Sequence, residues 1–136
     1  MIQVLFDEKG SGKTKRIISM ANEAIQTAKG SMVFVDDDNS YMFDLKHTIR
    51  FIDASEYDID GPKMFYGFLC GVSAQDFDLE YLFIDGFLKI VHHPIETLEG
   101  LFVQLEKFAL RADIKLVISI SGDPAGAPEF LKPYLV

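Results

Sequence analysis

Short apolar runs alternate with longer segments of helical periodicity along most of this chain. Each short run is rich in Val, Ile, Leu or Phe and is bounded by turn-forming residues, which is typical of a buried strand. Five such strands are expected, at residues 2–6, 32–35, 49–52, 81–84 and 116–120. The run at 49–52 is expected at an edge of the sheet.

Three of the longer segments have apolar side chains at the spacing of a helix. Helices are expected at residues 14–28, from the Asp60-Gly61-Pro62 turn to about residue 74, and at 95–112. Gly30 is positioned to end the first of them. A short helix is also expected near residues 129–134, in a proline-containing tail.

The alternation of strands and helices predicts an α/β fold with three layers (α/β/α), in which helices cover both faces of a mostly parallel five-stranded sheet. The chain has 136 residues, of which 49% are hydrophobic and 25% are charged. These values suit a single domain with one interior, spanning residues 1–136.

Charge and cysteine content narrow the class of function. The formal charge of −8 disfavours general binding to nucleic acid, whose phosphates would repel the domain. The only cysteine, Cys70, cannot form an internal disulfide, and the apolar run at 64–74 is about half the length that spans a bilayer. We therefore expect a cytoplasmic protein with no nucleic-acid partner and no membrane contact.

The first loop has the composition of an anion site. It reads Asp7-Glu8-Lys9-Gly10-Ser11-Gly12-Lys13-Thr14, follows the first strand and opens the first helix, which is the context of a phosphate-binding P-loop (Walker A motif). Successive N–H groups and a helix N-terminus attract anions, and glycines let phosphates approach the backbone. The residues expected to bind a nucleotide are Lys9, Gly10, Ser11, Gly12, Lys13 and Thr14. Of these, Lys13 would reach the β and γ phosphates, and the Thr14 hydroxyl would bind Mg²⁺.

One departure from the motif leaves an alternative open. The pattern G-x-x-x-x-G-K-[ST] has Asp7 in place of its first glycine. Aspartate tolerates unusual backbone angles, so we expect the turn to form, with a carboxylate close to the anionic ligand. The alternative is a glycine-rich strand–helix loop that binds nothing.

A second motif lies downstream. Tyr81-Leu82-Phe83-Ile84-Asp85 places an aspartate after four apolar residues, as in the Walker B strand whose carboxylate holds Mg²⁺ in P-loop proteins. Asp85 is therefore the expected metal ligand beside Thr14. The alternative is an aspartate that only caps a helix or a turn.

With these two motifs the chain resembles the P-loop NTPase superfamily, and within it the RecA-like group. The resemblance covers the five strands, and residues 10–14 and 81–85 carry it specifically. It implies that ATP and Mg²⁺ bind, and that strand 116–120 lies between strands 2–6 and 81–84. The chain also resembles small stand-alone PilT-like proteins, named after the twitching-motility ATPases, although it lacks the His-containing and acidic boxes of true motility ATPases.

The resemblance also bears on hydrolysis. Many RecA-like ATPases have a catalytic glutamate directly after the Mg²⁺ aspartate, where this chain has Gly86. RecA-type recombinases instead place a carboxylate after the second strand, in the sequence F-I-D-A-E. Residues 34–38 resemble that sequence, so Asp38 would orient the attacking water; a solvated acidic turn is the alternative. Near the end of the last strand, Ser121 is better placed than Ser119 to sense the γ-phosphate, or it only bonds the backbone of a turn.

Three functions are compatible with the sequence. The first is a Mg²⁺–ATP-binding domain with slow or partner-dependent hydrolysis, because Gly86 cannot polarise water and no arginine is obviously aimed at the site. The second is a non-enzymatic interaction module that keeps the fold with a degenerate P-loop. The third is a small-molecule kinase in which residues 36–38 receive an acceptor hydroxyl. A protein partner and a homo-oligomer are both left open.

Overall fold

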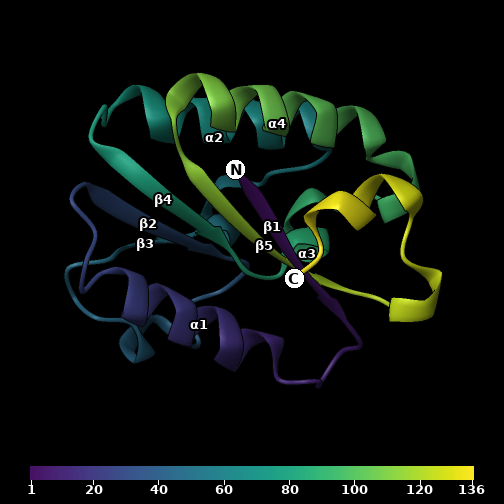
Figure 1. The fold of residues 1–136 in the computed structure, drawn as a ribbon, viewed down its shortest axis with the longest axis horizontal. Helices are drawn as coiled ribbons and strands as arrows, with labels where there is room; N and C mark the ends of the chain where they lie inside the picture. The colour runs from purple at the N-terminus through teal and green to yellow at the C-terminus, as the bar shows by residue number, and fades with distance from the viewer.

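Five parallel strands form one sheet in the computed structural model, which describes residues 1–136 (Figure 1). The strands are β1 (Ile2–Asp7), β2 (Ser31–Asp36), β3 (Arg50–Asp53), β4 (Leu79–Ile84) and β5 (Lys115–Ser121). Their spatial order is β1-β5-β4-β2-β3, and every neighbouring pair is parallel. All five predicted strands are confirmed, including the edge position of β3.

The strand order decides between branches of P-loop folds. β5 lies between β1 and β4, as the RecA-like resemblance implies. A direct pair between β1 and β4 would instead have placed the chain with the kinase and GTPase folds. The α/β fold is therefore of the RecA-like type.

Helices cover both faces of the sheet. α2 (Pro62–Ala74), α3 (Phe87–Val91) and α4 (Glu99–Ala112) lie on one face, and α1 (Lys13–Ala24) lies on the other (Figure 1). The interior is accordingly divided into a cluster of 27 buried residues on the side of α2–α4 and a cluster of 10 on the side of α1. Neighbouring strand residues alternate between them; Phe83, for example, faces α1 and Ile84 faces the larger cluster.

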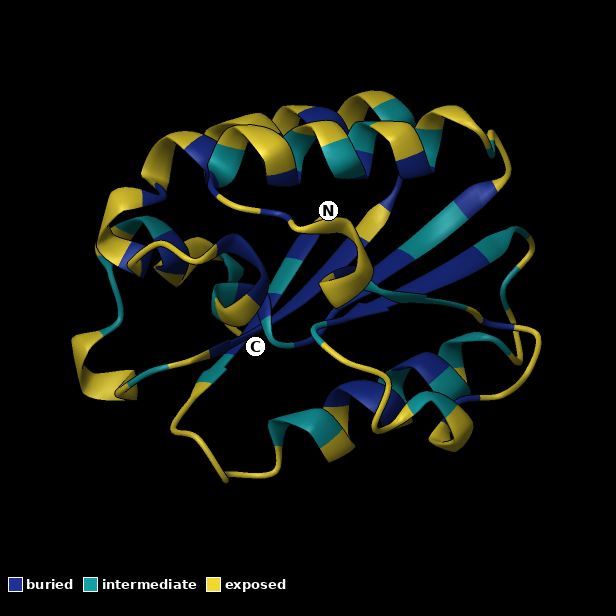
Figure 2. Ribbon diagram, turned by 180° about the vertical axis from the view of Figure 1, so that it is seen from behind, coloured by how far each residue is buried: buried dark blue, intermediate teal, exposed yellow.

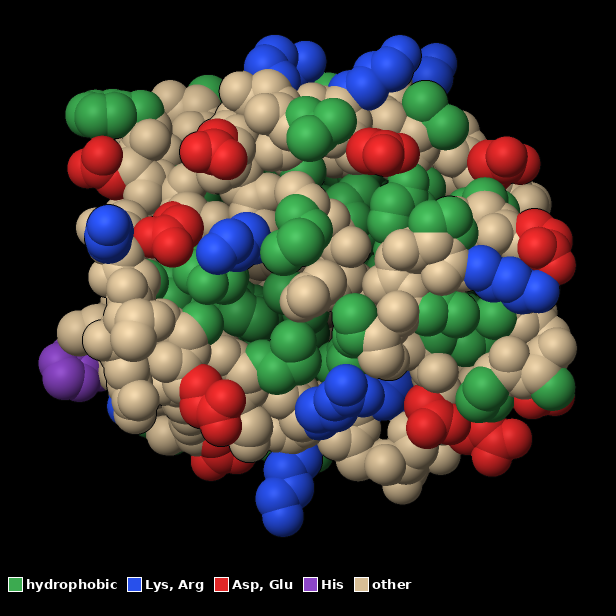
Figure 3. All heavy atoms as spheres, in the orientation of Figure 1, with side chains coloured by type: hydrophobic (Ala, Val, Ile, Leu, Met, Phe, Trp, Pro, Cys, Tyr) green, Lys and Arg blue, Asp and Glu red, His purple; other side chains and the backbone are tan.

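The inner strands β2, β4 and β5 are the most buried elements, and each long helix buries one stripe (Figure 2). In α4 the buried side chains are Leu101, Phe102, Leu105, Phe108 and Ala109, which confirms the helical spacing of apolar residues in this segment. Charges of both signs are interspersed with apolar side chains over the face shown in Figure 3. No helix combines the length and the apolar content needed to cross a membrane.

Helix boundaries differ from the predictions at several places. α1 ends at Ala24, and residues 25–27 form turns, so the helix stops well before Gly30. α4 begins only at Glu99, after a 3₁₀ turn at Ile95–Thr97. The five-residue α3 is invisible in the sequence pattern, because so short a helix cannot display a helical period.

The C-terminal residues lie along the free edge of β1. A 3₁₀ helix at Glu129–Tyr134 matches the short helix expected there. Leu135 then forms a parallel bridge with Val4, and the Tyr134 hydroxyl donates a hydrogen bond to Glu106 Oε2 at 2.6 Å. The tail is thus attached both to the sheet and to α4.

Candidate functional site

A cavity of about 910 Å³ opens between the β1–α1 loop and the carboxyl ends of β2, β4 and β5. The predicted site residues that line it are Lys9, Gly10, Gly12, Lys13, Thr14, Asp38, Asp85 and Ser121. Ser11 is the exception and does not line the cavity; its N–H donates to the Glu8 carbonyl at 3.2 Å. The fold therefore brings the loop after β1 together with residues at or just after the ends of β2, β4 and β5.

The loop between β1 and α1 has the geometry of an anion site. Gly10 and Gly12 have φ angles of +81° and +93°, a left-handed conformation that favours glycine. The N–H groups of Lys9, Gly10 and Gly12, like those of the first three residues of α1, donate to no acceptor within the protein. Free N–H groups at a helix N-terminus attract anions. The Lys13 ammonium lies beside them, where it donates to the Glu8 carbonyl at 2.9 Å.

Asp7 behaves differently from the sequence-based expectation. It is the last residue of β1, it pairs with Ser121 of β5, and its φ is not positive, so the first position of the motif requires no glycine here. Its carboxylate accepts the N–H of Glu8 at 2.8 Å and does not line the cavity. The expected carboxylate beside the ligand is therefore absent, because Asp7 turns back onto the loop backbone.

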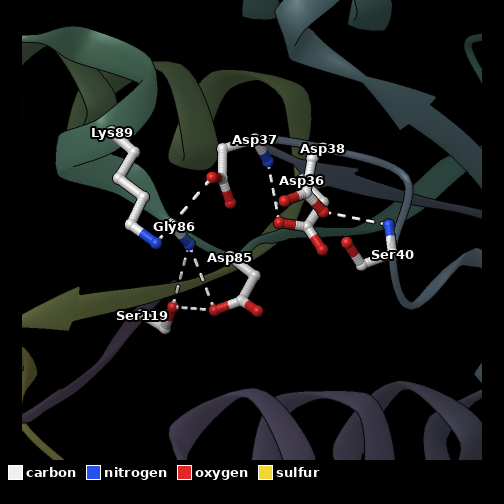
Figure 4. A network of polar contacts seen from close by, with 8 residues as sticks. All are labelled: Asp36, Asp37, Asp38, Ser40, Asp85, Gly86, Lys89 and Ser119. Atoms are coloured by element: carbon white, nitrogen blue, oxygen red, sulfur yellow. Dashed lines mark hydrogen bonds and ion pairs between the residues drawn. The ribbon is translucent and has the colours of Figure 1, made fainter. Parts of the chain in front are cut away.

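Three polar side chains form a row across neighbouring strands at the cavity wall (Figure 4). They are Asp36, Asp85 and Ser119, all buried. The strand registers align three apolar residues, Val35, Ile84 and Ile118. Each of the polar residues directly follows one of these three. Because side chains alternate along a strand, all three polar groups face α1 and the loop that precedes it.

Asp85 is held firmly by its neighbours. The Ser119 hydroxyl and the Gly86 N–H both donate to Asp85 Oδ1, the latter at 3.1 Å. The Gly86 N–H also reaches Ser119 Oγ at 3.2 Å. Both contacts involve Oδ1, which leaves Oδ2 free for a ligand in the cavity. Ser119 thus orients Asp85, whereas Ser121 lies exposed at the strand end and lines the cavity.

Asp36 is a site residue that the sequence analysis did not single out. It is 2% exposed; its Oδ1 accepts the Asp37 N–H at 2.7 Å, and its Oδ2 has no hydrogen-bond partner. Burial, followed by hydrogen bonding to Asp37 and the charge of Asp85, raises the pKa of Asp36 from 3.8 to about 8. The sequence did contain a signal for this residue, because alternation along a strand places Asp36 on the same face of β2 as the apolar Phe34, and an aspartate there is expected to be buried.

Asp38 lies in a different environment from Asp36. β2 ends at Asp36, so the alternation of a strand does not extend to Asp37 and Asp38. Asp38 is exposed on the cavity wall, where its Oδ1 accepts the N–H of Ser40 at 2.9 Å, and this bond lowers the pKa of Asp38. Its role in orienting water stays a prediction.

Asp37 occupies the space beside Gly86. Gly86 has a φ of +69°, and a Cβ at this position would overlap the Asp37 carboxylate. The same carboxylate lies 4.0 Å from the ammonium of Lys89 in α3. Lys89 lines the cavity, whereas no arginine does. This cation was missed because α3 is not visible in the sequence.

The strand order and the loop at the end of β1 define a RecA-like α/β fold. Among solved structures, the chain is similar to the flagellar accessory protein FlaH from Methanocaldococcus jannaschii, with a TM-score of 0.56 and 12% sequence identity. The match covers 97% of this chain and 65% of that one. No protein-family model and no curated protein match the sequence. At this identity the similarity supports the fold alone, and the PilT-like resemblance stays a prediction.

Proposed function

We propose that this chain binds ATP together with Mg²⁺ and hydrolyses it slowly, or only with a partner. The observation that carries the proposal is the shared cavity, in which the free N–H groups of the β1–α1 loop and Lys13 lie opposite the carboxylate of Asp85. A Mg²⁺–triphosphate needs both kinds of group, anion-binding donors for the phosphates and an oxygen ligand for the metal.

The phosphates would lie on the loop. The free N–H groups of Lys9, Gly10, Gly12 and the first turn of α1 would donate to them, and Lys13 would exchange the Glu8 carbonyl for phosphate oxygens. The Ser121 hydroxyl at the end of β5 is placed to contact the terminal phosphate. Ser11 contributes at most its position in the turn, since it does not line the cavity.

The residues present fit a magnesium ion. Mg²⁺ prefers oxygen ligands and is usually held by one or two carboxylates, with substrate phosphates and water at its other positions. Thr14 and Asp85 line the same cavity, and Ser119 and Gly86 fix the orientation of the Asp85 carboxylate. When bound, the metal would neutralise phosphate charge. The buried, unpartnered Oδ2 of Asp36 is a further oxygen that a cation could satisfy.

Slow hydrolysis follows from the groups available to orient water. No side chain follows Asp85, because residue 86 is glycine, and the space beside it is taken by Asp37. Asp38 is the candidate catalytic residue; its lowered pKa keeps it ionised. It is exposed and held by a turn to Ser40 rather than by core packing, so it positions water loosely, and loose positioning is costly for phosphoryl transfer.

A second cavity favours a small-molecule kinase as the other candidate function. It has a volume of about 280 Å³ and shares Asp37 and Lys89 with the larger cavity. Ser55, Asp58 and His92 also line it. A compact acceptor with a hydroxyl group could lie there, beside the phosphate end of a nucleotide.

A thermal-shift panel of ATP, ADP and GTP, each with Mg²⁺, tests the proposed function. A ligand that binds only the folded state raises the melting temperature, so ATP should stabilise the wild type and should fail to stabilise Lys13→Ala. A wild type that responds to none of the nucleotides would refute the proposal and favour the interaction module. ATP consumption that requires an added hydroxyl compound would favour the kinase.

A further inference from the structure

The ends of β2 and β4 bring two buried carboxyl groups to one wall of the cavity. Asp36 is 2% exposed and Asp85 is 5% exposed, and both line the cavity. Their strands are neighbours in the sheet, and both carboxyl groups lie on the side that faces α1 (Figure 4). Two groups of like charge in a buried wall repel each other unless a positive charge is placed between them.

The protein satisfies these two groups unequally. Asp85 Oδ1 accepts hydrogen bonds from Ser119 and Gly86. Asp36 Oδ1 accepts the Asp37 N–H, but Asp36 Oδ2 is buried and has no partner. Buried polar atoms without a partner are rare in native proteins. This one therefore indicates a ligand that completes it.

No cation of the protein itself fills this place. The Lys13 ammonium donates to the Glu8 carbonyl at 2.9 Å. The Lys89 ammonium lies 4.0 Å from Asp37 Oδ2, and neither lysine forms an ion pair with Asp36 or Asp85. A cation at this place would therefore come from solution.

We propose that Asp36 and Asp85 together bind a divalent cation, Mg²⁺ or Mn²⁺, before any nucleotide arrives. Two carboxylates with water at the remaining positions are an ordinary ligand set for Mg²⁺. The Asp37 N–H fixes Asp36 Oδ1 and the Ser119 hydroxyl fixes Asp85 Oδ1, which leaves the Oδ2 atom of each residue available to a metal. The inference rests on the proposed function for the later use of the cation, but the binding itself requires no nucleotide.

A preloaded cation has a consequence for nucleotide binding. The wall at residues 36–38 carries three carboxyl groups, which would repel a triphosphate. A divalent cation between Asp36 and Asp85 offsets that charge and leaves coordination positions that phosphate oxygens can take from water. The metal would then be part of the surface that recognises the nucleotide.

Calorimetric titration of the full chain with MnCl₂, without nucleotide, tests the proposal. The wild type should bind Mn²⁺ at one site, and Asp36→Asn and Asp85→Asn should each weaken that affinity by at least about tenfold. Asp60→Asn is the control for net charge, because Asp60 is exposed and lies outside both cavities; its affinity should match the wild type. Melting curves without metal verify that each variant folds.

Two results would overturn the cation site. One is wild-type affinity for Mn²⁺ in Asp36→Asn, and the other is no binding of Mn²⁺ to the wild type without nucleotide. Lys13→Ala separates this inference from the proposed function. It should lose ATP affinity while binding Mn²⁺ at least as tightly as the wild type, because a nearby positive charge is removed. Asp36-dependent Mn²⁺ binding in a protein that binds no nucleotide would support the cation site and refute the proposed function.

Discussion

The carboxylate of Asp37 fills the space in which a side chain at Gly86 would lie. Gly86 follows Asp85 directly, at the position where many of the RecA-like ATPases that the chain resembles have a catalytic glutamate. The glycine is therefore matched to Asp37, since a glutamate at position 86 would require the Asp37 side chain to move. The carboxyl groups of this site come from two strands, β2 and β4, instead of from one.

Replacing Gly86 should be costly. Gly86→Ala combines a φ of +69° with overlap of the new Cβ and Asp37, and we expect it to lower the free energy of unfolding by about 1–3 kcal/mol. Urea denaturation gives this value. Gly67→Ala is the matched control in α2, where a Cβ meets nothing; it should leave stability unchanged or raise it by up to about 1 kcal/mol. Equal stability of the Gly86→Ala and wild-type proteins would contradict the steric relationship.

Lys13 should determine affinity for triphosphate and not stability. Lys13→Ala removes a charged donor, a loss of about 1.5–3 kcal/mol, so we expect at least about tenfold weaker binding of Mg²⁺–ATP by calorimetry. Lys107→Ala, an exposed lysine of α4 outside the cavity, should bind ATP like the wild type. Undiminished affinity in Lys13→Ala would remove the loop from the proposed site.

Hydrolysis by the isolated protein should be far below the roughly 1–100 s⁻¹ of kinases. The reason is that the only candidate for orienting water, Asp38, is exposed and held by a turn. Any residual phosphate release should fall more in Asp38→Asn than in Asp37→Asn. The reason is that the Asp37 carboxylate already lies against Gly86 and beside the Lys89 ammonium. Brisk turnover without a partner would disprove slow hydrolysis. Equal loss in both variants would leave slow hydrolysis standing and would exclude only the proposed role of Asp38.

The attachment of the tail to α4 should weaken at high pH. Burial and the hydrogen bond to Glu106 raise the pKa of Tyr134 from 10.0 to about 12. Because the folded-state pKa is the higher one, the stabilisation is complete below pH 10 and is lost as the pH rises from 10 to 12. The free energy of unfolding of the wild type should exceed that of Tyr134→Phe by about 0.5–1.5 kcal/mol near neutral pH. Urea denaturation should show that this difference shrinks above pH 10. A difference that is independent of pH would argue against this bond.

The sequence was sufficient for the fold because the strands are mostly apolar and the helices α1, α2 and α4 are long enough to show a helical period. Residues 116–120, for instance, form a run that is apolar except for Ser119, as expected of a strand buried on both faces. The β1–α1 loop could also be predicted from the sequence, because its turn has positive φ angles at positions 10 and 12, and such angles favour glycine. The predicted position of the Asp7 carboxylate, close to the ligand, was wrong, because a motif gives the spacing of residues but not the direction of a side chain.

The remaining part of the site depends on contacts between distant segments. Asp36 and Asp38 are both acidic and only two positions apart, and the point at which β2 ends decides which of them is buried. Lys89 reaches the cavity from a helix too short to leave a periodic signal. Ser119 gains its role only from the register of β4 and β5, which places its hydroxyl beside Asp85.

The bridge between Leu135 and Val4 has a consequence for how the sheet can meet another chain. β3 at the opposite edge has only four residues, so β1 is the longer edge, and the Val136 N–H donates to its Val4 carbonyl at 3.1 Å. A covered edge cannot recruit a foreign strand. If the tail were displaced, an incoming peptide could extend the sheet by strand addition. It would join the strand that leads directly into the β1–α1 loop, so docking at this edge would be transmitted along β1 to the proposed nucleotide site.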